Sequence, residues 1–535
     1  MYCVGRPVLG LLTALNATVD PLPKPNRGPR WWPLLLLLAL VGARLVQVWV
    51  FRDHERQFKF ASTWPALRLA APAALAWFLL FSRLRWRTRL AGLAALAIAT
   101  VLGLALVRVR GIDGDRVPVL EWRWSHRPSG TTPGGHPGPA TTGTTRAPIP
   151  GAADFPQFQG PTRDGFLTGP LLSTNWNAKP PTFLWRQPIG EAWSGFAVTD
   201  GLAITLEQSG DMEVAVAMDL RDGARVWTNG YPARFENSQA GNGPRSTPTI
   251  VGSRVYIAGA TGILRCLDRA SGSNVWNVDL AKEHAARMPE WGYSASPLVV
   301  DGLVWVPAGS KGRSLVAHDA TTGRFRFGGG DSSAAYASPV MARLAGKDQI
   351  LVLNDVGIAS HDPADGRILW EHTIPEAPHV AAPVPVGTNR VAVSVGYGKG
   401  TFVIEVGQSP DGSWTHVVAW KSIRLKSKFA NLIPRGDTLY GLDDGALVAL
   451  DLTTGALRWK ETRYGHGQML WVGDVLLVGA ENGEAALVDP RPQGMRELGR
   501  FRALADKTWN PPALCGNLLL MRNDREIVCH RLPTR

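Results

Sequence analysis

One eleven-residue pattern recurs along the carboxyl-terminal two thirds of the chain and constrains its fold more than any other feature. In Ala449–Trp459 it reads ALDLTTGALRW: an Asp, a Gly four residues later, and an aromatic residue four residues after that. The same spacing occurs in Ala217–Trp227, Cys266–Trp276, Ala317–Phe327 and Ser360–Trp370. Internal repetition of this kind decides the architecture of a protein before any single residue does.

Each copy is typical of two short antiparallel strands joined by a tight turn. The Gly supplies the positive φ that such turns need, and the aromatic residue lies on the second strand. Successive aspartates, from Asp219 to Asp268, Asp319 and Asp362, are 49, 51 and 43 residues apart. This period indicates one four-stranded propeller blade per repeat and does not fit a helical solenoid.

Three weaker copies continue the series and complete the ring. They are Phe402–Trp420, Ala486–Phe501 and Glu526–Leu532, which gives eight sets of inner strands. The last set lacks an outer strand, whereas Thr182–Gln187 is a spare strand ahead of the first set. Pairing these two segments would leave no long unpaired edge. The sequence therefore predicts an all-β, eight-bladed β-propeller.

The aromatic residues of the repeat are predicted to be structural. We expect them to pack between blades, where truncation of one to Ala would cost about 3 to 5 kcal/mol. This group consists of Trp227, Trp276, Trp370, Trp420 and Trp459.

The amino-terminal part of the chain has a different character. Trp31–Phe51, Trp64–Ser82 and Leu90–Val109 are apolar and long enough to span a bilayer core. Arg44 and Arg68 interrupt the first two segments. Each arginine could extend to the membrane interface, or make a polar contact inside a helix bundle or with a quinone head group.

The distribution of basic residues predicts the orientation of these spans. Lys24, Arg27 and Arg30 precede the first span, and Arg83, Arg85, Arg87 and Arg89 separate the second from the third. Positive charge favours the cytoplasmic side. We therefore expect an inner-membrane protein with its amino terminus in the cytoplasm and its propeller in the periplasm or outside the cell.

These observations divide the chain into four parts. Residues 1–30 form a cytoplasmic segment, 31–110 three transmembrane helices, 111–153 a tether rich in Gly, Thr and Pro, and 154–535 the propeller. The stretch 128–153 has no apolar run that could form a core, so we expect it to be flexible.

The distribution of charge and the positions of the cysteines bear on two questions: whether the propeller binds nucleic acid, and whether it contains a disulfide. The formal net charge is +13, but residues 1–152 hold 19 Lys and Arg against 6 Asp and Glu, so the remaining 38 of each leave the propeller neutral. A basic footprint for nucleic acid is therefore absent. Cys515 and Cys529 fall on the first and third strands of one blade, too far apart for a disulfide, and free thiols are expected.

Residues just ahead of each inner strand should converge on the ring axis, together with those in the turns between second and third strands. They form a polar ring with aromatic walls, which is typical of a small-molecule pocket. Capping of backbone groups is the alternative role for Ser and Asn at such positions. The candidate ligand-binding residues are Glu207, Glu213, Asn242, Arg245, Trp291, Tyr336, Lys428, His466, Gln468, Trp509 and Asn510.

The repeats resemble those of pyrroloquinoline quinone (PQQ) propellers. These occur in quinoprotein dehydrogenases and in the propeller lipoprotein of the outer-membrane β-barrel assembly machinery. The segment Asp154–Gly165 also resembles the lead-in of bacterial PQQ-like repeat proteins. The resemblance covers about residues 154 to 532.

The resemblance implies two alternative functions. A membrane-bound PQQ-dependent dehydrogenase would oxidise alcohols or sugars and pass electrons to membrane quinone. By this resemblance PQQ would stack on Trp291 or Trp509, Glu207 and Asn242 would be Ca²⁺ ligands, and Arg245 or Lys428 would hold the PQQ carboxylates; the catalytic base is unassigned. Such enzymes stack PQQ against a disulfide of adjacent cysteines, which this chain lacks.

The other function is a binding or scaffold module for partners outside the membrane. The compact length of the propeller and the missing pair of cysteines favour this function over the dehydrogenase. The sequence assigns no cofactor firmly, and PQQ with Ca²⁺ is the candidate that goes with the dehydrogenase alternative.

Overall fold

The computed structural model describes residues 28–51, 55–124, 149 and 153–535. The chain forms two compact units. A helical unit lies within Met1–Asp53 and Ala61–Leu106, and a β unit lies within His54–Phe60 and Val107–Arg535. The predicted cytoplasmic segment up to residue 27 lies outside the described residues.

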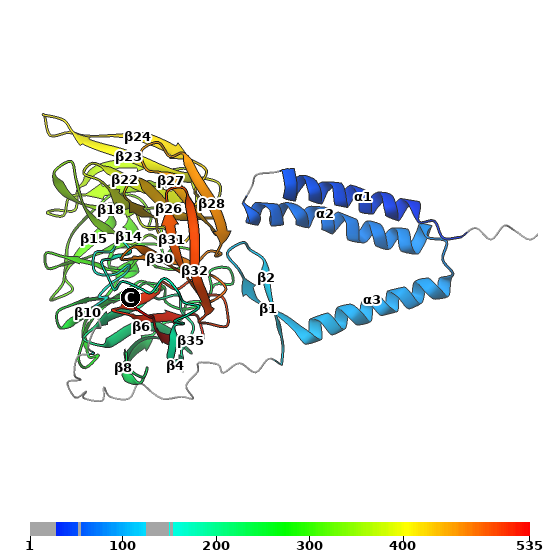
Figure 1. Ribbon diagram of the computed structural model, residues 1–535, viewed down its shortest axis with the longest axis horizontal. Helices are drawn as coiled ribbons and strands as arrows, with labels where there is room; N and C mark the ends of the chain where they lie inside the picture. The colour runs from blue at the N-terminus through cyan, green and yellow to red at the C-terminus, as the bar shows by residue number, and fades with distance from the viewer. Residues whose placement is uncertain (1–27, 52–54, 125–148, 150–152) are drawn as a thin grey trace, which may run out of the picture. The chain divides into compact units, whose positions relative to one another are not determined.

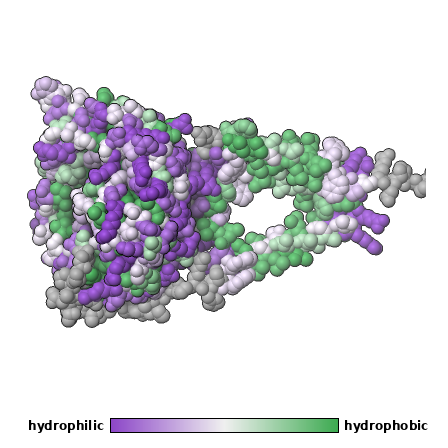
Figure 2. Space-filling model, in the orientation of Figure 1, coloured by the Kyte–Doolittle hydropathy of each residue, from purple (hydrophilic) through white to green (hydrophobic). Residues whose placement is uncertain are grey.

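The helical unit contains three helices that are long and apolar enough to cross a membrane. Helix α1 (Trp32–Val46) continues into the π-helical turn η1 (Gln47–Phe51), α2 (Arg56–Ala76) continues into η2 (Trp77–Phe81), and α3 covers Trp86–Leu106. Their outward side chains are hydrophobic (Figure 2). The second helix begins earlier than the predicted span, at Arg56. The third ends earlier, at Leu106, because residues 107–112 form a strand.

The β unit is an eight-bladed propeller, as the repeat predicts (Figure 1). Within the described residues, eight sheets each contain four consecutive antiparallel strands or close variants of that order. The first blade contains β5 (Ala197–Thr199), β6 (Leu202–Ser209), β7 (Met212–Asp219) and β8 (Arg225–Pro232). The second contains β9 (Thr249–Val251), β10 (Arg254–Ala258), β11 (Ile263–Asp268) and β12 (Asn274–Asp279), followed by the short helix α4 (Leu280–Glu283). The third contains β13 (Leu298–Val300), β14 (Leu303–Ser310), β15 (Arg313–Asp319) and β16 (Phe325–Gly329).

The middle blades keep the same order of strands. The fourth contains β17 (Val340–Leu344), β18 (Lys347–Leu353), β19 (Gly357–His361) and β20 (Ile368–Thr373). The fifth contains β21 (Val384–Val386), β22 (Arg390–Val395), β23 (Gly400–Gln408) and β24 (Trp414–Ser422). The sixth contains β25 (Ile433–Arg435), β26 (Thr438–Asp443), β27 (Ala446–Asp451) and β28 (Leu457–Arg463).

The last two blades close the ring. The seventh contains β29 (Gln468–Val472), β30 (Val475–Gly479), β31 (Glu484–Arg491) and β32 (Gly494–Arg502), with β3 (Phe166–Leu167) added in parallel to β29. The eighth contains β33 (Ala513–Cys515), β34 (Leu518–Arg522) and β35 (Glu526–Arg531), and its outer strand is β4 (Thr182–Pro188). The predicted pairing of the spare strand at Thr182–Gln187 with the last strand of the eighth blade is therefore confirmed. Cys515 and Cys529, separated by β34, are buried free thiols as expected.

The seams between blades explain the spacing of the repeat. The Trp227 indole donates to the carbonyl of Arg269 at 2.9 Å, in the Asp turn of the next blade. A Cβ added to Gly272 of that turn, where φ is +70°, would lie 2.5 Å from the same indole. Glycine is thus required both for the left-handed backbone and for the close approach of the ring. Trp276 and Trp420 meet the turns at Gly323 and Gly455 in the same way.

A hairpin precedes the propeller in the β unit and was not predicted from the sequence. Strand β1 (Val107–Ile112) pairs with β2 (Pro118–Trp122), and both fall in segments expected to be the third span and the tether. Their exposed and buried side chains do not alternate cleanly, so the strand period is weak. Residues 125–148 and 150–152 of the predicted tether lie outside the described residues.

Candidate axial cavity

A cavity of about 170 Å³ lies on the axial face of the propeller. It is bounded by loops that enter the inner strands of several blades, as the sequence pattern predicts for the ring axis. Five predicted candidates line it: Arg245, Trp291, Tyr336, Gln468 and Trp509. Their convergence follows from the repeat, because the same position in each blade is carried to the same axis.

Aromatic rings form most of the cavity wall. The rings of Trp291 and Tyr336 are stacked, with centroids 4.9 Å apart and planes 25° apart. The rings of Trp193 and Trp509 lie 4.8 Å apart, and Phe429 packs on Trp509 at 5.1 Å. Flat, rigid surfaces of this kind suit a planar ligand.

Two predicted residues provide polar groups at this wall. The guanidinium of Arg245 donates to the carbonyls of Ala240, Gly241 and Gly243 at 2.5–3.1 Å. Burial lowers the pKa of Arg245 to about 10, so its side chain is still charged at neutral pH. The Gln468 amide donates to the carbonyls of Phe429 and Trp509. Both side chains therefore fix the loops around the cavity.

The predicted Ca²⁺ ligands, Glu207 and Asn242, lie elsewhere. Both oxygens of Glu207 accept from the Arg225 guanidinium, at 2.8 and 2.9 Å, and one also accepts from the Gly190 amide. Asn242 donates to Glu191 at 3.0 Å and accepts from the Asn237 amide. Since these oxygens already have strong donors, the pair does not fit a calcium ion.

Glu213 and Asn510 also lie outside the cavity lining. Glu213 accepts from the Ala260 amide at 2.9 Å and from the Tyr231 hydroxyl, and burial raises its pKa. The Asn510 amide donates to the carbonyls of Ala192 and Ser194. Both side chains satisfy neighbouring groups, which is the capping role considered from the sequence.

The last two predicted residues, Lys428 and His466, contact the β1–β2 hairpin. Lys428 Nζ donates to the Gly114 carbonyl at 3.0 Å, and His466 Nε2 lies 3.0 Å from Asp115 Oδ1. Burial opposes ionisation of Asp115, but the hydrogen bond and charge of His466 outweigh it and lower the pKa of Asp115 to about 2. The hairpin tip is thus tied to the propeller by charged contacts.

Sequence reasoning missed Glu481, which organises this region. Its carboxylate accepts from the Trp509 indole at 2.7 Å, the Gly114 amide at 2.8 Å and the His466 amide at 2.9 Å. Glu481 lies in the turn between β30 and β31, the second and third strands of its blade. The rule that selected Glu207 and Glu213 in the first blade would have found it here.

In the described part of the chain, two groups of three Asp, Glu or His residues place their potential metal-ligand atoms within 4.8 Å of one another. Asp115, Asp444 and His466 form one, but Arg463 and Lys428 already supply its positive charge. In the other, Glu283 accompanies His284 and His318, whose Nε2 atoms are 3.0 Å apart. Arg313 donates to Nδ1 of His284, which leaves the Nε2 proton on that ring. A hydrogen bond between two neutral imidazoles therefore accounts for this pair.

Fold and cavity together define a β-propeller with an aromatic axial cavity. The chain resembles the PQQ-like β-propeller repeat proteins: residues 210–461, just under half of the chain, match the model of the family described as outer membrane protein assembly factor BamB. No curated protein matches the chain.

Several solved structures are similar to this chain at low sequence identity. BamB from Moraxella catarrhalis is 16% identical, with a TM-score of 0.48, and the match covers 66% of this chain and 100% of that one. Saccharomyces cerevisiae Sqt1 is 12% identical, with a TM-score of 0.49 and coverage of 66% and 99%. A quinohemoprotein alcohol dehydrogenase from Pseudomonas putida HK5 is 13% identical, with a TM-score of 0.42 and coverage of 72% and 81%.

PQQ itself does not fit the cavity. A cavity of about 150 Å³ accommodates benzene, and this cavity measures about 170 Å³. PQQ has three fused rings and three carboxylates, so the larger part of it would lie outside the space between the aromatic walls. Together with the occupied oxygens of Glu207 and Asn242 and the absence of adjacent cysteines, this gives no support to a quinoprotein site.

Proposed function

We propose that the chain is a membrane-anchored binding module that displays its propeller outside the cytoplasm and takes a small planar ligand in the axial cavity. The aromatic cavity is the observation that carries this proposal. Its volume corresponds to a ligand of about one ring, and its walls include two pairs of closely packed aromatic rings.

The positive charge at the cavity favours a ligand with an anionic group. Arg245 and Arg116 both line it. Lys507 lies next to its wall, with Nζ 3.9 Å from the centroid of the Trp509 ring. Asp113 is the only acidic residue among the described lining residues, and burial raises the pKa of its carboxyl. A carboxylate would therefore be attracted to this site more than an amine.

Three apolar helices support membrane anchoring, and the arginines between the second and third support a cytoplasmic position for that loop. The propeller, which follows the third helix, would then be extracytoplasmic. Protein partners outside the membrane remain compatible with this role, since a propeller offers a wide rim beyond its axis.

The test is a titration of the full chain in lipid nanodiscs with benzoate, benzamide and benzylamine. These probes share one ring and differ in charge. We expect binding in the order benzoate, benzamide, benzylamine, measured by calorimetry and by saturation-transfer NMR against empty nanodiscs. Absence of binding by all three would refute the proposal.

Variants of the aromatic wall make the test specific. Trp509→Ala and Trp291→Ala should each lower the affinity for benzamide at least tenfold, because each removes a flat contact surface. Trp414→Ala, on the outer strand β24 and away from the cavity, is the matched control and should bind like the wild type. Equal binding by all three variants would place the ligand elsewhere.

A further inference from the structure

We propose that the β1–β2 hairpin completes the ligand site, supplying Arg116 as the group that selects a negative charge and covering the cavity while ligand is bound. This inference rests on the proposed function and adds its specificity and its control. It concerns residues 107–122, which the repeat pattern does not include.

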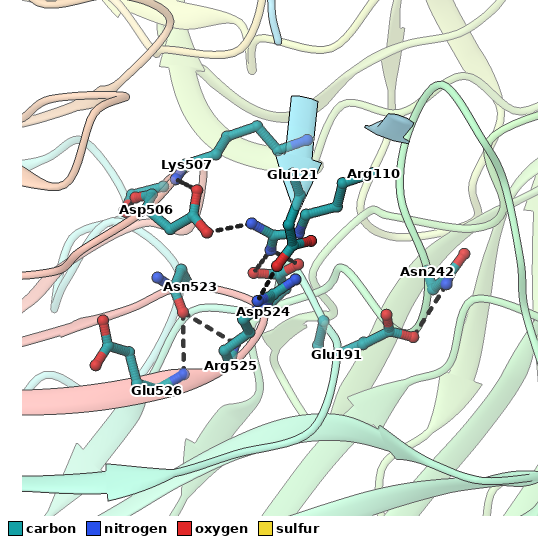
Figure 3. Close-up of polar contacts among 12 residues, drawn as sticks. Arg110, Glu121, Glu191, Asn242, Asp506, Lys507, Asn523, Asp524, Arg525 and Glu526 are labelled. Carbon is teal, nitrogen blue, oxygen red and sulfur yellow. Dashed lines mark hydrogen bonds and ion pairs between the residues drawn. The ribbon is translucent and has the colours of Figure 1, made fainter. Parts of the chain in front are cut away.

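The stem of the hairpin is held to the propeller by ion pairs on both strands (Figure 3). Arg110 of β1 pairs with Asp506 and with Asp524, and its side chain is only 13% exposed. Glu121 of β2 lies 3.6 Å from Arg525, and its side chain is 2% exposed. Lys507 Nζ donates to the Ile112 carbonyl at 2.9 Å. Buried, paired charges of this kind favour the docked position of the hairpin over an open one, since removing one partner is costly.

The tip of the hairpin fits closely against the propeller. Gly114 donates to Glu481 and accepts from Lys428. A Cβ added to Gly114 would lie 2.2 Å from Cδ2 of His466, so only Gly is accommodated without movement. Glu481 also holds the indole of Trp509, which forms part of the cavity wall. The hairpin tip and the aromatic wall therefore share one carboxylate.

The tip also provides part of the cavity lining. Ile112, Asp113, Gly114 and Arg116 all line it. The turn is fixed by Asp113, whose Oδ1 accepts from the amides of Asp115 and Val117 at 2.9 and 2.8 Å. Arg116 has a φ of +63°, a left-handed conformation that is uncommon for a residue other than glycine. Backbone strain at a residue that lines a cavity is typical of functional positions.

Arg116 and Arg245 differ in whether the N–H donors of their guanidinium groups already have hydrogen-bond partners. Arg245 donates to three backbone carbonyls. The backbone amide of Arg116 donates to the Asp113 carbonyl at 3.0 Å, but its guanidinium makes no hydrogen bond or ion pair among the residues that the structure describes; its charge acts on the nearby Tyr397. A guanidinium offers five donors in a fork that matches a carboxylate. Arg116 is therefore the cavity residue best suited to recognise an anionic ligand.

The first test separates charge recognition from general binding. Arg116→Gln should lower benzoate affinity about tenfold, as expected for loss of a charged hydrogen bond, and leave benzamide affinity unchanged. Arg123→Gln, an exposed arginine just after β2, is the matched control and should retain the preference for benzoate. If Arg116→Gln keeps that preference, Arg116 is not the selecting group.

The second test locks the hairpin in place. A Cβ at Gly114 would lie 2.6 Å from Cγ of His466, so the Cβ atoms of residues 114 and 466 are at most about 4.1 Å apart, within disulfide reach. The double variant Gly114→Cys with His466→Cys, in a Cys3→Ser background, can therefore be closed by oxidation and opened by reduction.

Stopped-flow tryptophan fluorescence should show that oxidation slows benzamide association and dissociation at least tenfold, and that reduction restores both rates. Equal rates in the two states would refute the covering role of the hairpin. Failure of the wild type to bind any probe would instead refute the proposed function, so the two failures can be told apart.

Discussion

At the scale of single residues, two histidines that directly precede a repeat aspartate, His318 and His361, stabilise the following turn by a hydrogen bond across it. Nδ1 of His361 donates to the Gly366 carbonyl at 2.9 Å, and Nδ1 of His318 does the same to Gly323. Both imidazoles are buried, and burial lowers the pKa of His361 to about 4. Each blade turn with such a histidine is therefore formed with a neutral ring.

Because the His361 ring is neutral in the folded protein, we expect the protein to lose stability in acid. Between its unfolded pKa near 6.5 and its folded pKa of about 4, His361 binds more protons in the unfolded chain, so the free energy of unfolding falls as pH falls. From pH 7 to pH 5 this residue should contribute a loss of about 2 kcal/mol. His361→Gln should be less stable at pH 7 and should show a shallower pH slope, by up to one proton. Urea unfolding between pH 7 and pH 5 measures both. A slope equal to that of the wild type would contradict the assignment.

Single residues also show how much of the cavity lining could be predicted from the sequence. Trp291, Tyr336 and Trp509 line the cavity at positions that the repeat places near the axis, whereas their role as ligand-binding residues stays a prediction. The role of Glu207 was not predictable, because its partner Arg225 lies just beyond the repeat turn and looks like a surface residue. Arg116 was missed because it belongs to a hairpin with a weak strand pattern.

At the scale of elements, the ring is closed by β4 and β35, which are about 340 residues apart in the sequence. Their pairing was predictable because one blade lacked a strand and the chain had one to spare. The hairpin was not predictable, because β1 directly follows the apolar helix α3 and reads as its continuation. Pattern reasoning thus succeeds where a segment repeats and fails where it occurs once.

The closure can be tested by a cross-link at the register that the structure gives. Thr182 and Arg531 are paired across β4 and β35, and both are exposed. Thr182→Cys with Arg531→Cys should form a disulfide on oxidation and stabilise the propeller by about 2 to 4 kcal/mol, since it constrains a very long loop of the unfolded chain. Thermal unfolding of oxidised and reduced protein measures the gain, with the single variants as controls. Failure to cross-link would contradict this register.

At the scale of the whole molecule, the chain consists of a basic amino-terminal part and a propeller without net charge. The excess of positive charge lies around the three apolar helices, where it predicts orientation, and the propeller has 38 basic and 38 acidic residues in 153–535. Charge in this chain therefore predicts placement at a membrane and gives no footprint for nucleic acid.

This placement can be tested with a membrane-impermeant maleimide on spheroplasts. In a Cys3→Ser background the remaining cysteines, Cys266, Cys515 and Cys529, are buried, so they should give little background. Lys311→Cys, in an exposed propeller turn, should be labelled in intact spheroplasts. Arg85→Cys, in the exposed loop between the second and third helices, should be labelled only after lysis, because positive loops remain in the cytoplasm. The opposite pattern would invert the topology and move the axial cavity, with its hairpin, to the cytoplasmic side.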